Sequence, residues 1–263
     1  MSDARSERLL GELTFHDVSR LLTPRSVLIL PIGSIEQHGP HLPLNTDVLI
    51  AEALSAAIVK RWMGTFDLWM LPTISVSLAR EHEWAAGTLS LSVSGMTQLI
   101  HDSGRTIRRS LPTRNLLILN GHGGNRGILE ALVRDLRADM ELNVCTFHPA
   151  ALSDDGAGGG AIPEIHGGKN ETSIMLAVAP QLVRLDRLSN DATKANAVHV
   201  HETILDLAVT WPWTSDDGSL SQGGVIGDPQ RATIEFGHRL IEEAVHRAGV
   251  VIKQLLEKQS SPG

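Results

Sequence analysis

Cysteine and aromatic residues are scarce in this chain of 263 residues, which has one cysteine, no tyrosine and 3% aromatic residues. Because Cys145 is the only cysteine, an internal disulfide is impossible, and a reducing, cytoplasmic location is predicted. With so few aromatic side chains, the core must be built mainly from Leu, Val, Ile and Ala. The composition, 42% hydrophobic and 20% charged, is ordinary for a soluble globular protein.

An excess of basic charge and long apolar runs are also missing. The 23 Lys and Arg residues are outnumbered by 30 Asp and Glu residues, and the net charge of −7 argues against nucleic-acid or anionic-membrane partners. No apolar run approaches the roughly 20 residues needed to span a bilayer. The first ten residues are charged and polar, so no signal peptide is predicted. A small molecule is therefore the expected partner.

Strand-like and helix-like segments alternate along residues 27–180, and a long final helix is predicted from Pro229. Such an alternation predicts βαβ units, with a mainly parallel central sheet and helices on both faces. A Gly- and Asp-rich segment, Ser153–Ala161, is predicted to be a mobile loop. No repeat or domain boundary is evident, so residues 1–263 are predicted to form a single α/β domain. Apolar strands are expected at Val27–Leu30, Asp67–Ile74, Leu116–Leu119 and Leu142–Phe147.

The most informative segment follows the first predicted strand. Pro31 and Gly33 end that strand, and Glu36, His38 and Asp47 come after it. Residues at i and i+2 of an extended segment face the same side, so Glu36 and His38 can reach one site. Taken singly, Glu36 fits a solvated acid, His38 a hydrogen-bonding loop residue, and Asp47 the N-cap of the next helix. Together, at the end of a buried strand, they favour a metal site.

A second polar cluster follows the third predicted strand, at the turn Asn120–Asn125 with the sequence NGHGGN. Its glycines allow a tight turn and the close approach of a ligand. A phosphate-binding turn is the alternative, but the segment lacks the ending of a P-loop and the spacing of a dinucleotide fingerprint. His122 at its centre would join the first cluster, because ligand sites of such sheets lie beyond the strands' carboxyl ends.

The combined set of two carboxylates and two imidazoles suits Zn²⁺, Mn²⁺ or Fe²⁺ better than Ca²⁺ or Mg²⁺. One carboxylate bridging two ions about 3.5–4 Å apart is the usual arrangement of a two-metal hydrolase. Such ions would lower the pKa of a shared water toward ~7 and polarise a carbonyl. The sequence therefore predicts two divalent ions, with Zn or Mn as the leading candidates and Fe as a further one.

A third polar cluster precedes a predicted helix near residue 174. Glu171 either interacts with the dipole of that helix or acts as a metal ligand and proton shuttle, and the second role is favoured. His166 is predicted to be catalytic, donating to the substrate oxyanion or to the leaving nitrogen.

Substrate contacts are predicted for three further residues, His82, Trp84 and Gly123. His82 lies between Glu81 and Glu83 in a polar segment. That segment either lines the pocket or is an exposed loop, and the sequence does not separate the two alternatives.

These segments resemble the motifs of the creatininase (creatinine amidohydrolase) family. Gly33–Asp47 is similar to its long first motif, and Asn120–Asn125 and His166–Ser173 are similar to the second and third motifs, in the same order. Glu81-His82 followed by Gly87–Leu91 resembles the intervening segment. The resemblance covers roughly residues 12–180, and the C-terminal third is only loosely similar. It implies a three-layer α/β/α fold, a two-metal centre and subunits often assembled as hexamers.

By motif position, the resemblance implies Glu36 at one ion, His38 and His122 at the other, and Asp47 as the bridge. Members of the family cleave C–N bonds of small cyclic or formylated amides. Relatives include a deformylase of flavin and deazaflavin precursors, a peptidase of redox-cofactor maturation and a hydrolase of a cyclic keto-sugar. Cleavage of a small amide by a metal-activated water is the leading hypothesis, and a short peptide bond or a cyclic ketone is the alternative substrate.

One position departs from the pattern. Creatininase carries a metal-binding Glu two residues after the histidine of its second motif, whereas this chain has Gly124 there. The chain is therefore predicted not to be a creatininase in the strict sense, and either to complete its first metal site with Glu171 or water or to leave that site weakly occupied. A non-catalytic metal- or ligand-binding protein on the same scaffold is the alternative from another class.

Overall fold

The computed structural model describes residues 8–149, 163–188, 197–206 and 208–259, so the predicted loop Ser153–Ala161 lies outside the described residues. At the centre is a parallel sheet with the strand order β2-β1-β3-β4. β1 and β3 are buried along their whole lengths, as expected for a parallel sheet covered on both faces. The strands are β1 (Val27–Ile32), β2 (Leu68–Met70), β3 (Asn115–Asn120) and β4 (Asn143–Phe147).

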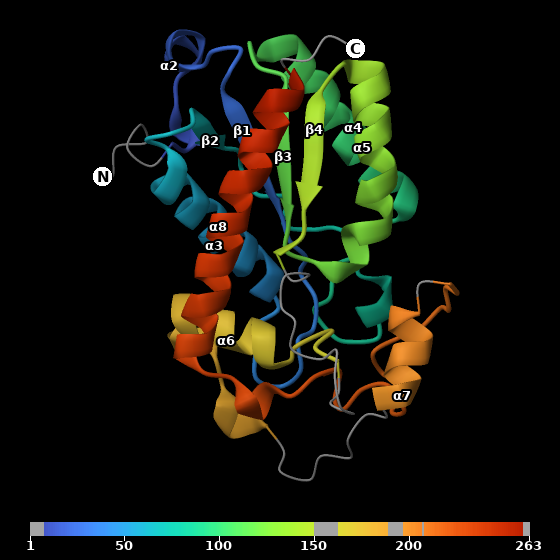
Figure 1. Cartoon of the computed structure of the whole chain (residues 1–263). Helices are drawn as coiled ribbons and strands as arrows, with labels where there is room; N and C mark the ends of the chain where they lie inside the picture. Colours follow the sequence, from blue (N-terminus) through green and yellow to red (C-terminus); the bar gives the residue numbers. More distant parts are fainter. Residues whose placement is uncertain (1–7, 150–162, 189–196, 207, 260–263) are drawn as a thin grey trace.

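Helices cover both faces of this sheet (Figure 1). Side chains alternate along a strand, so Ile29 and Leu117 belong to one core cluster and Leu28 and Ile118 to the other. The prediction of a three-layer α/β/α fold with a mainly parallel sheet is confirmed. One face is covered by α3 (Thr46–Trp62), α6 (Lys169–Val178) and α8 (Ile234–Gln259). The other face is covered by α4 (Val93–Ser110) and α5 (Arg126–Met140). Two further helices, α2 (Phe15–Leu21) and α7 (Ala197–Val200), are short.

Two helix starts differ from those predicted. Asn45, not Asp47, is at the N-cap of α3, so Asp47 lies inside the first turn and its carboxylate is free for other contacts. The final helix begins at Ile234, because Pro229 opens a separate one-turn 3₁₀ helix, Pro229–Arg231. Within the described part of the chain, no helix is both long and apolar enough to cross a membrane.

Helices α6 and α8 approach most closely at Gly237. A Cβ atom there would lie 2.0 Å from the backbone oxygen of Ser173 and 3.1 Å from the Cβ of Ala177. Gly237→Ala is therefore expected to push the helices apart and to lower the free energy of unfolding by about 1–3 kcal/mol in urea denaturation. Gly127→Ala on α5 is the control, since a Cβ atom added there would meet nothing within 4 Å beyond the backbone of its own helix. Equal unfolding midpoints for the two variants would contradict the argument.

Candidate metal centre

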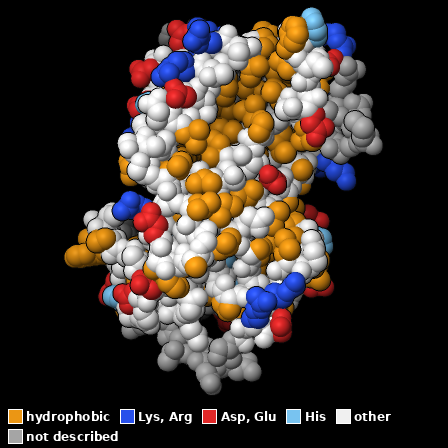
Figure 2. Space-filling model, turned by 180° about the vertical axis from the view of Figure 1, so that it is seen from behind, with side chains coloured by type: hydrophobic (Ala, Val, Ile, Leu, Met, Phe, Trp, Pro, Cys, Tyr) orange, Lys and Arg blue, Asp and Glu red, His pale blue; other side chains and the backbone are white. Residues whose placement is uncertain are grey.

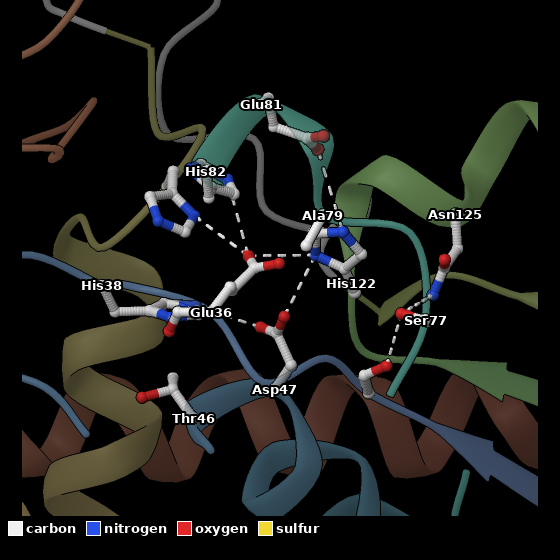
Figure 3. A network of polar contacts seen from close by, with 12 residues as sticks. Glu36, His38, Thr46, Asp47, Ser77, Ala79, Glu81, His82, His122 and Asn125 are labelled. Carbon is white, nitrogen blue, oxygen red and sulfur yellow. Dashed lines mark hydrogen bonds and ion pairs between the residues drawn. The ribbon is translucent and has the colours of Figure 1, made fainter. Parts of the chain in front are cut away.

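The polar motifs meet beyond the carboxyl ends of β1 and β3, which pair side by side with Ile32 opposite Asn120. Glu36 and His38 follow β1, His122 follows β3, and Asp47 lies in the first turn of α3 (Figure 3). All four side chains are buried, with no residue more than 4% exposed. Adjacent strand ends therefore bring residues from distant parts of the sequence into one cluster.

Asp47 divides its carboxylate between two histidines. Its Oδ1 lies 3.1 Å from Nε2 of His38, and its Oδ2 lies 3.0 Å from Nδ1 of His122. The same Nδ1 of His122 is 3.1 Å from Oε1 of Glu36, whereas Nε2 of His38 is 3.8 Å from Oε2 of Glu171. The geometry thus pairs His122 with Glu36 and His38 with Glu171. The family resemblance implies His38 and His122 as ligands of the same ion. In the structure, the two rings approach different oxygens of Asp47, so they lie in different halves of the cluster.

Several buried oxygens of the cluster have no hydrogen bond. Among the described residues, neither oxygen of Glu36 nor Oδ2 of Asp47 has a hydrogen-bond partner. Buried carboxylates are costly unless a cation compensates them. Ligand atoms of Glu36, Asp47 and His122 lie within 4.8 Å of one another, as do those of His38, His166 and Glu171. These residues fit a pair of divalent transition-metal ions.

Charge and burial shift the pKa values within the cluster. Burial raises the pKa of Glu36, against the opposing effect of His122. Burial alone would lower the pKa of His38, but the carboxylates of Asp47, Glu171 and Glu36 outweigh it and raise this pKa to about 10. Similarly, burial is outweighed at His122, where Glu36 and Asp47 raise the pKa well above its usual value. The two histidines in turn outweigh burial at Asp47 and hold its pKa well below the usual range. Protons on these rings must leave before an ion binds.

Glu171 and His166 approach the same centre from the third polar segment. Oε2 of Glu171 accepts a hydrogen bond from the backbone N–H of Gly167 at 2.6 Å, and burial raises the pKa of Glu171 to about 7 against the effect of His38. Nε2 of His166 donates to the carbonyl oxygen of Gln37 at 2.6 Å. Burial and the neighbouring His38 lower the pKa of His166 well below its usual value. The neutral ring therefore carries its proton on Nε2 and turns an unprotonated Nδ1 toward the cluster.

Gln37 contributes to the site although the sequence pattern assigned it no role. Its Nε2 donates to Oγ of Ser215 and to the carbonyl oxygen of Gly224, each at 3.0 Å. Ser215 also lies 2.7 Å from Nδ1 of His82, whose ring stacks on His166 with centroids 4.0 Å apart. Gln37 therefore links the first motif to the C-terminal third of the chain. No local signal could have found it, because its partners are remote in sequence.

The three predicted substrate-binding residues lie at different depths. His82 is buried, and its Nε2 is 3.5 Å from Oε1 of Glu36. Trp84 is 47% exposed, and its Nε1 donates to Ser215 at 2.8 Å. Gly123 is exposed at the start of the one-turn helix that follows His122. His82 and Gly123 adjoin the cluster, Trp84 is linked to it through Ser215 and His82, and contact with a substrate stays a prediction for each.

Known proteins share these features. The family model described as creatinine amidohydrolase matches residues 11–252. The chain belongs to the creatininase family. A mycofactocin precursor peptide peptidase of Mycobacterium ulcerans is 35% identical over 242 residues, which cover 90% of this chain and 88% of that protein. A creatinine amidohydrolase of Pseudomonas putida is 32% identical over 200 residues, covering 68% of this chain and 74% of the other.

Solved creatininases have the same fold as this family member. One variant creatininase superposes with a TM-score of 0.76 at 26% identity, covering 95% of this chain and 99% of that structure. A manganese form of creatininase gives a TM-score of 0.75 at 25% identity over 94% and 98% of the two chains. The predicted family and enzyme class are confirmed: the chain is a metal-dependent creatininase-family hydrolase that acts on C–N bonds.

Proposed function

We propose that this hydrolase cleaves the C–N bond of a small amide with two divalent ions, Zn or Mn, or Fe, held in the buried cluster. Asp47 carries the proposal, because its two oxygens face the two halves of the cluster. Glu36 and His122 would hold one ion, His38 and Glu171 the other. Manganese and zinc–zinc forms of creatininase support this choice of metals. When bound, such ions lower the pKa of a water toward ~7 and polarise the carbonyl.

Protons are moved by the protein's own groups. Glu171, whose side chain is 20% exposed and lies 3.8 Å from Nε2 of His38, can accept a proton from the attacking water and pass it to the leaving nitrogen. His166 presents an unprotonated Nδ1, 3.6 Å from Oε1 of Glu36. It can donate to the leaving group only after it has accepted a proton. Glu171 is therefore the primary proton carrier, and His166 is the second.

A short peptide is the second candidate substrate. The 35% identity to a mycofactocin precursor peptide peptidase supports it. The rings of Trp213 and His82 are nearly perpendicular, with centroids 6.1 Å apart, and Trp213 also lines a cavity of about 410 Å³ together with Trp211 and Leu220. A cavity of this volume, connected to His82 through Trp213, can accommodate residues that flank a cleaved peptide bond.

Metal analysis and a substrate panel test the proposal. The purified chain is expected to bind about two divalent ions, to lose activity on chelation, and to regain it with Mn²⁺ or Zn²⁺. The panel contains formamides, lactams, cyclic ketones and short peptides. Turnover of a formamide or lactam supports the leading candidate, and turnover of peptides alone supports the second. A chain that binds no transition metal contradicts both, and bound metal without any turnover supports a binding protein.

We further propose that the chain acts in the cytoplasm as a homo-oligomer, a hexamer by family resemblance. Hydrophobic side chains form a long band on the face shown in Figure 2. Beside α4, a groove of about 390 Å³ is lined by apolar residues that include Leu71, Pro72 and Leu99. Large exposed apolar patches of this kind usually mark interaction sites. The molar mass in solution, from light scattering, tests the assembly.

A further inference from the structure

The two histidines of the cluster differ at their outer nitrogens. Nδ1 of His38 lies 3.1 Å from the carbonyl oxygen of Glu36, to which it can donate, and this leaves Nε2 for an ion. His122 instead turns Nδ1 toward Glu36 and Asp47. Its outer atom, Nε2, is buried and has no hydrogen bond among the described residues. A metal-ligating histidine almost always donates its other ring N–H to a carboxylate, carbonyl or water, so His122 requires a partner.

A carboxylate faces this unpartnered nitrogen. Oε1 of Glu81 lies 3.8 Å from Nε2 of His122, and the Glu81 side chain is 17% exposed (Figure 3). Glu81 belongs to the one-turn 3₁₀ helix η2 (Arg80–His82), whose backbone is anchored because the N–H of Ser215 donates to the carbonyl oxygen of Glu81 at 2.9 Å. A side-chain shift of about 1 Å would bring the two atoms to hydrogen-bond distance.

Gly124 keeps the space between these two groups open. A Cβ atom at position 124 would lie 2.4 Å from Oε1 of Glu81 and 2.5 Å from Nε2 of His122. Both distances are shorter than real Cβ contacts. A larger residue would therefore come between the carboxylate and the imidazole, so Gly124 and Glu81 belong to one arrangement.

We propose that Glu81 is a positioning residue of the metal centre. Its carboxylate accepts the Nε2–H of His122 when Nδ1 binds an ion, which fixes the tautomer and the orientation of the ring. Gly124 gives the carboxylate access to that nitrogen. The inference rests on the proposed function, because it requires an ion at Glu36, Asp47 and His122. Glu81 contacts neither substrate nor ion and acts through His122.

Titration of the chelator-treated full chain with Mn²⁺ alone tests the proposal. Glu81→Ala is expected to weaken binding of one ion by about 10–100-fold. Glu81→Gln should recover most of this loss, because its side-chain carbonyl can accept the same N–H. The visible spectrum of the Co²⁺-loaded chain should shift in Glu81→Ala and stay near that of the wild type in Glu81→Gln. Glu83→Ala is the control and should not change Mn²⁺ affinity. This acid is on the same loop, but its Oε2 lies 3.9 Å from Nε of Arg80.

Equal losses in Glu81→Ala and Glu81→Gln would contradict the proposal, because they would place the carboxylate on the ion itself. Unchanged Mn²⁺ affinity in both variants would show that the contact does not form, and would also overturn it. A wild-type chain that binds neither Mn²⁺ nor Zn²⁺, Fe²⁺ or Co²⁺ would refute the proposed function instead, so the two failures are distinguishable.

Gly124→Ala provides a second route if Glu81→Ala does not fold, as circular dichroism would show. The methyl group should produce the same loss of Mn²⁺ affinity, whereas Gly127→Ala should not, because a Cβ there meets nothing within 4 Å. Combining Glu81→Ala with Gly124→Ala should add little further loss, since both remove one contact. Fully additive losses would contradict the proposal.

Discussion

Asp47→Asn is expected to release both ions and to lower kcat/KM at least about a thousandfold, because the ions bring the pKa of water from 15.7 toward ~7. The two oxygens of Asp47 lie 3.1 Å from His38 and 3.0 Å from His122. An asparagine has one carbonyl oxygen and no charge. One half of the centre therefore loses its shared ligand, and the other half keeps only a neutral one. Asparagine has nearly the same volume as aspartate, so packing in the first turn of α3 should be preserved.

Metal per chain, measured by mass spectrometry after gel filtration, checks this result. Glu52→Gln on the same helix is the control and should retain the ions of the wild type. The contrary outcome is an Asp47→Asn chain that holds both ions with unchanged affinity. That result would show that the other ligands bind the two ions without a bridging carboxylate from Asp47. Such a result would overturn the central observation of the proposed function.

The strand ends of β1 and β3 explain how much of the site could be predicted. Polar residues directly after two buried strands were expected on one rim of a parallel sheet, and the pairing of Ile32 with Asn120 brings Glu36 and His122 to an ion-pair distance of 3.1 Å. Local patterns were sufficient because the strands are adjacent. The hydrophobic periodicity likewise predicted the layers of the fold.

Other parts of the site depend on tertiary contacts that no local pattern contains. Asp47 resembled an N-cap, but the cap is Asn45, and the helix turn directs Asp47 inward. Gln37 bonds to Ser215 and Gly224 from the C-terminal third. That third of the chain has weak periodicity, so the sequence could not place it. The contact between Gly124 and Glu81 could not be predicted either. Glu81 lies on a different loop and approaches Gly124 only in the folded chain.

Glu171→Gln is expected to separate the two halves of the centre. Oε2 of Glu171 lies 3.8 Å from Nε2 of His38, so the loss should be confined to the ion at His38 while the ion at His122 remains. The variant also lacks the carboxylate that moves the proton, and kcat should fall by about 10²–10⁴-fold. Glu36→Gln is the reciprocal variant: it should release the ion at His122 and spare the one at His38.

Calorimetric titration with Mn²⁺ should therefore show two binding steps for the wild type and one for Glu171→Gln or Glu36→Gln. Glu130→Gln, an exposed acid on α5 paired with Arg126, is the control and should keep both steps. Two unchanged binding steps with a reduced kcat would restrict Glu171 to proton transfer and contradict its role as a ligand. Loss of both ions from Glu171→Gln and from Glu36→Gln, with both retained in Glu130→Gln, would show that the ions bind as one cooperative unit. Only reciprocal single losses, together with the double loss in Asp47→Asn, assign each ion to its own ligands and Asp47 to both.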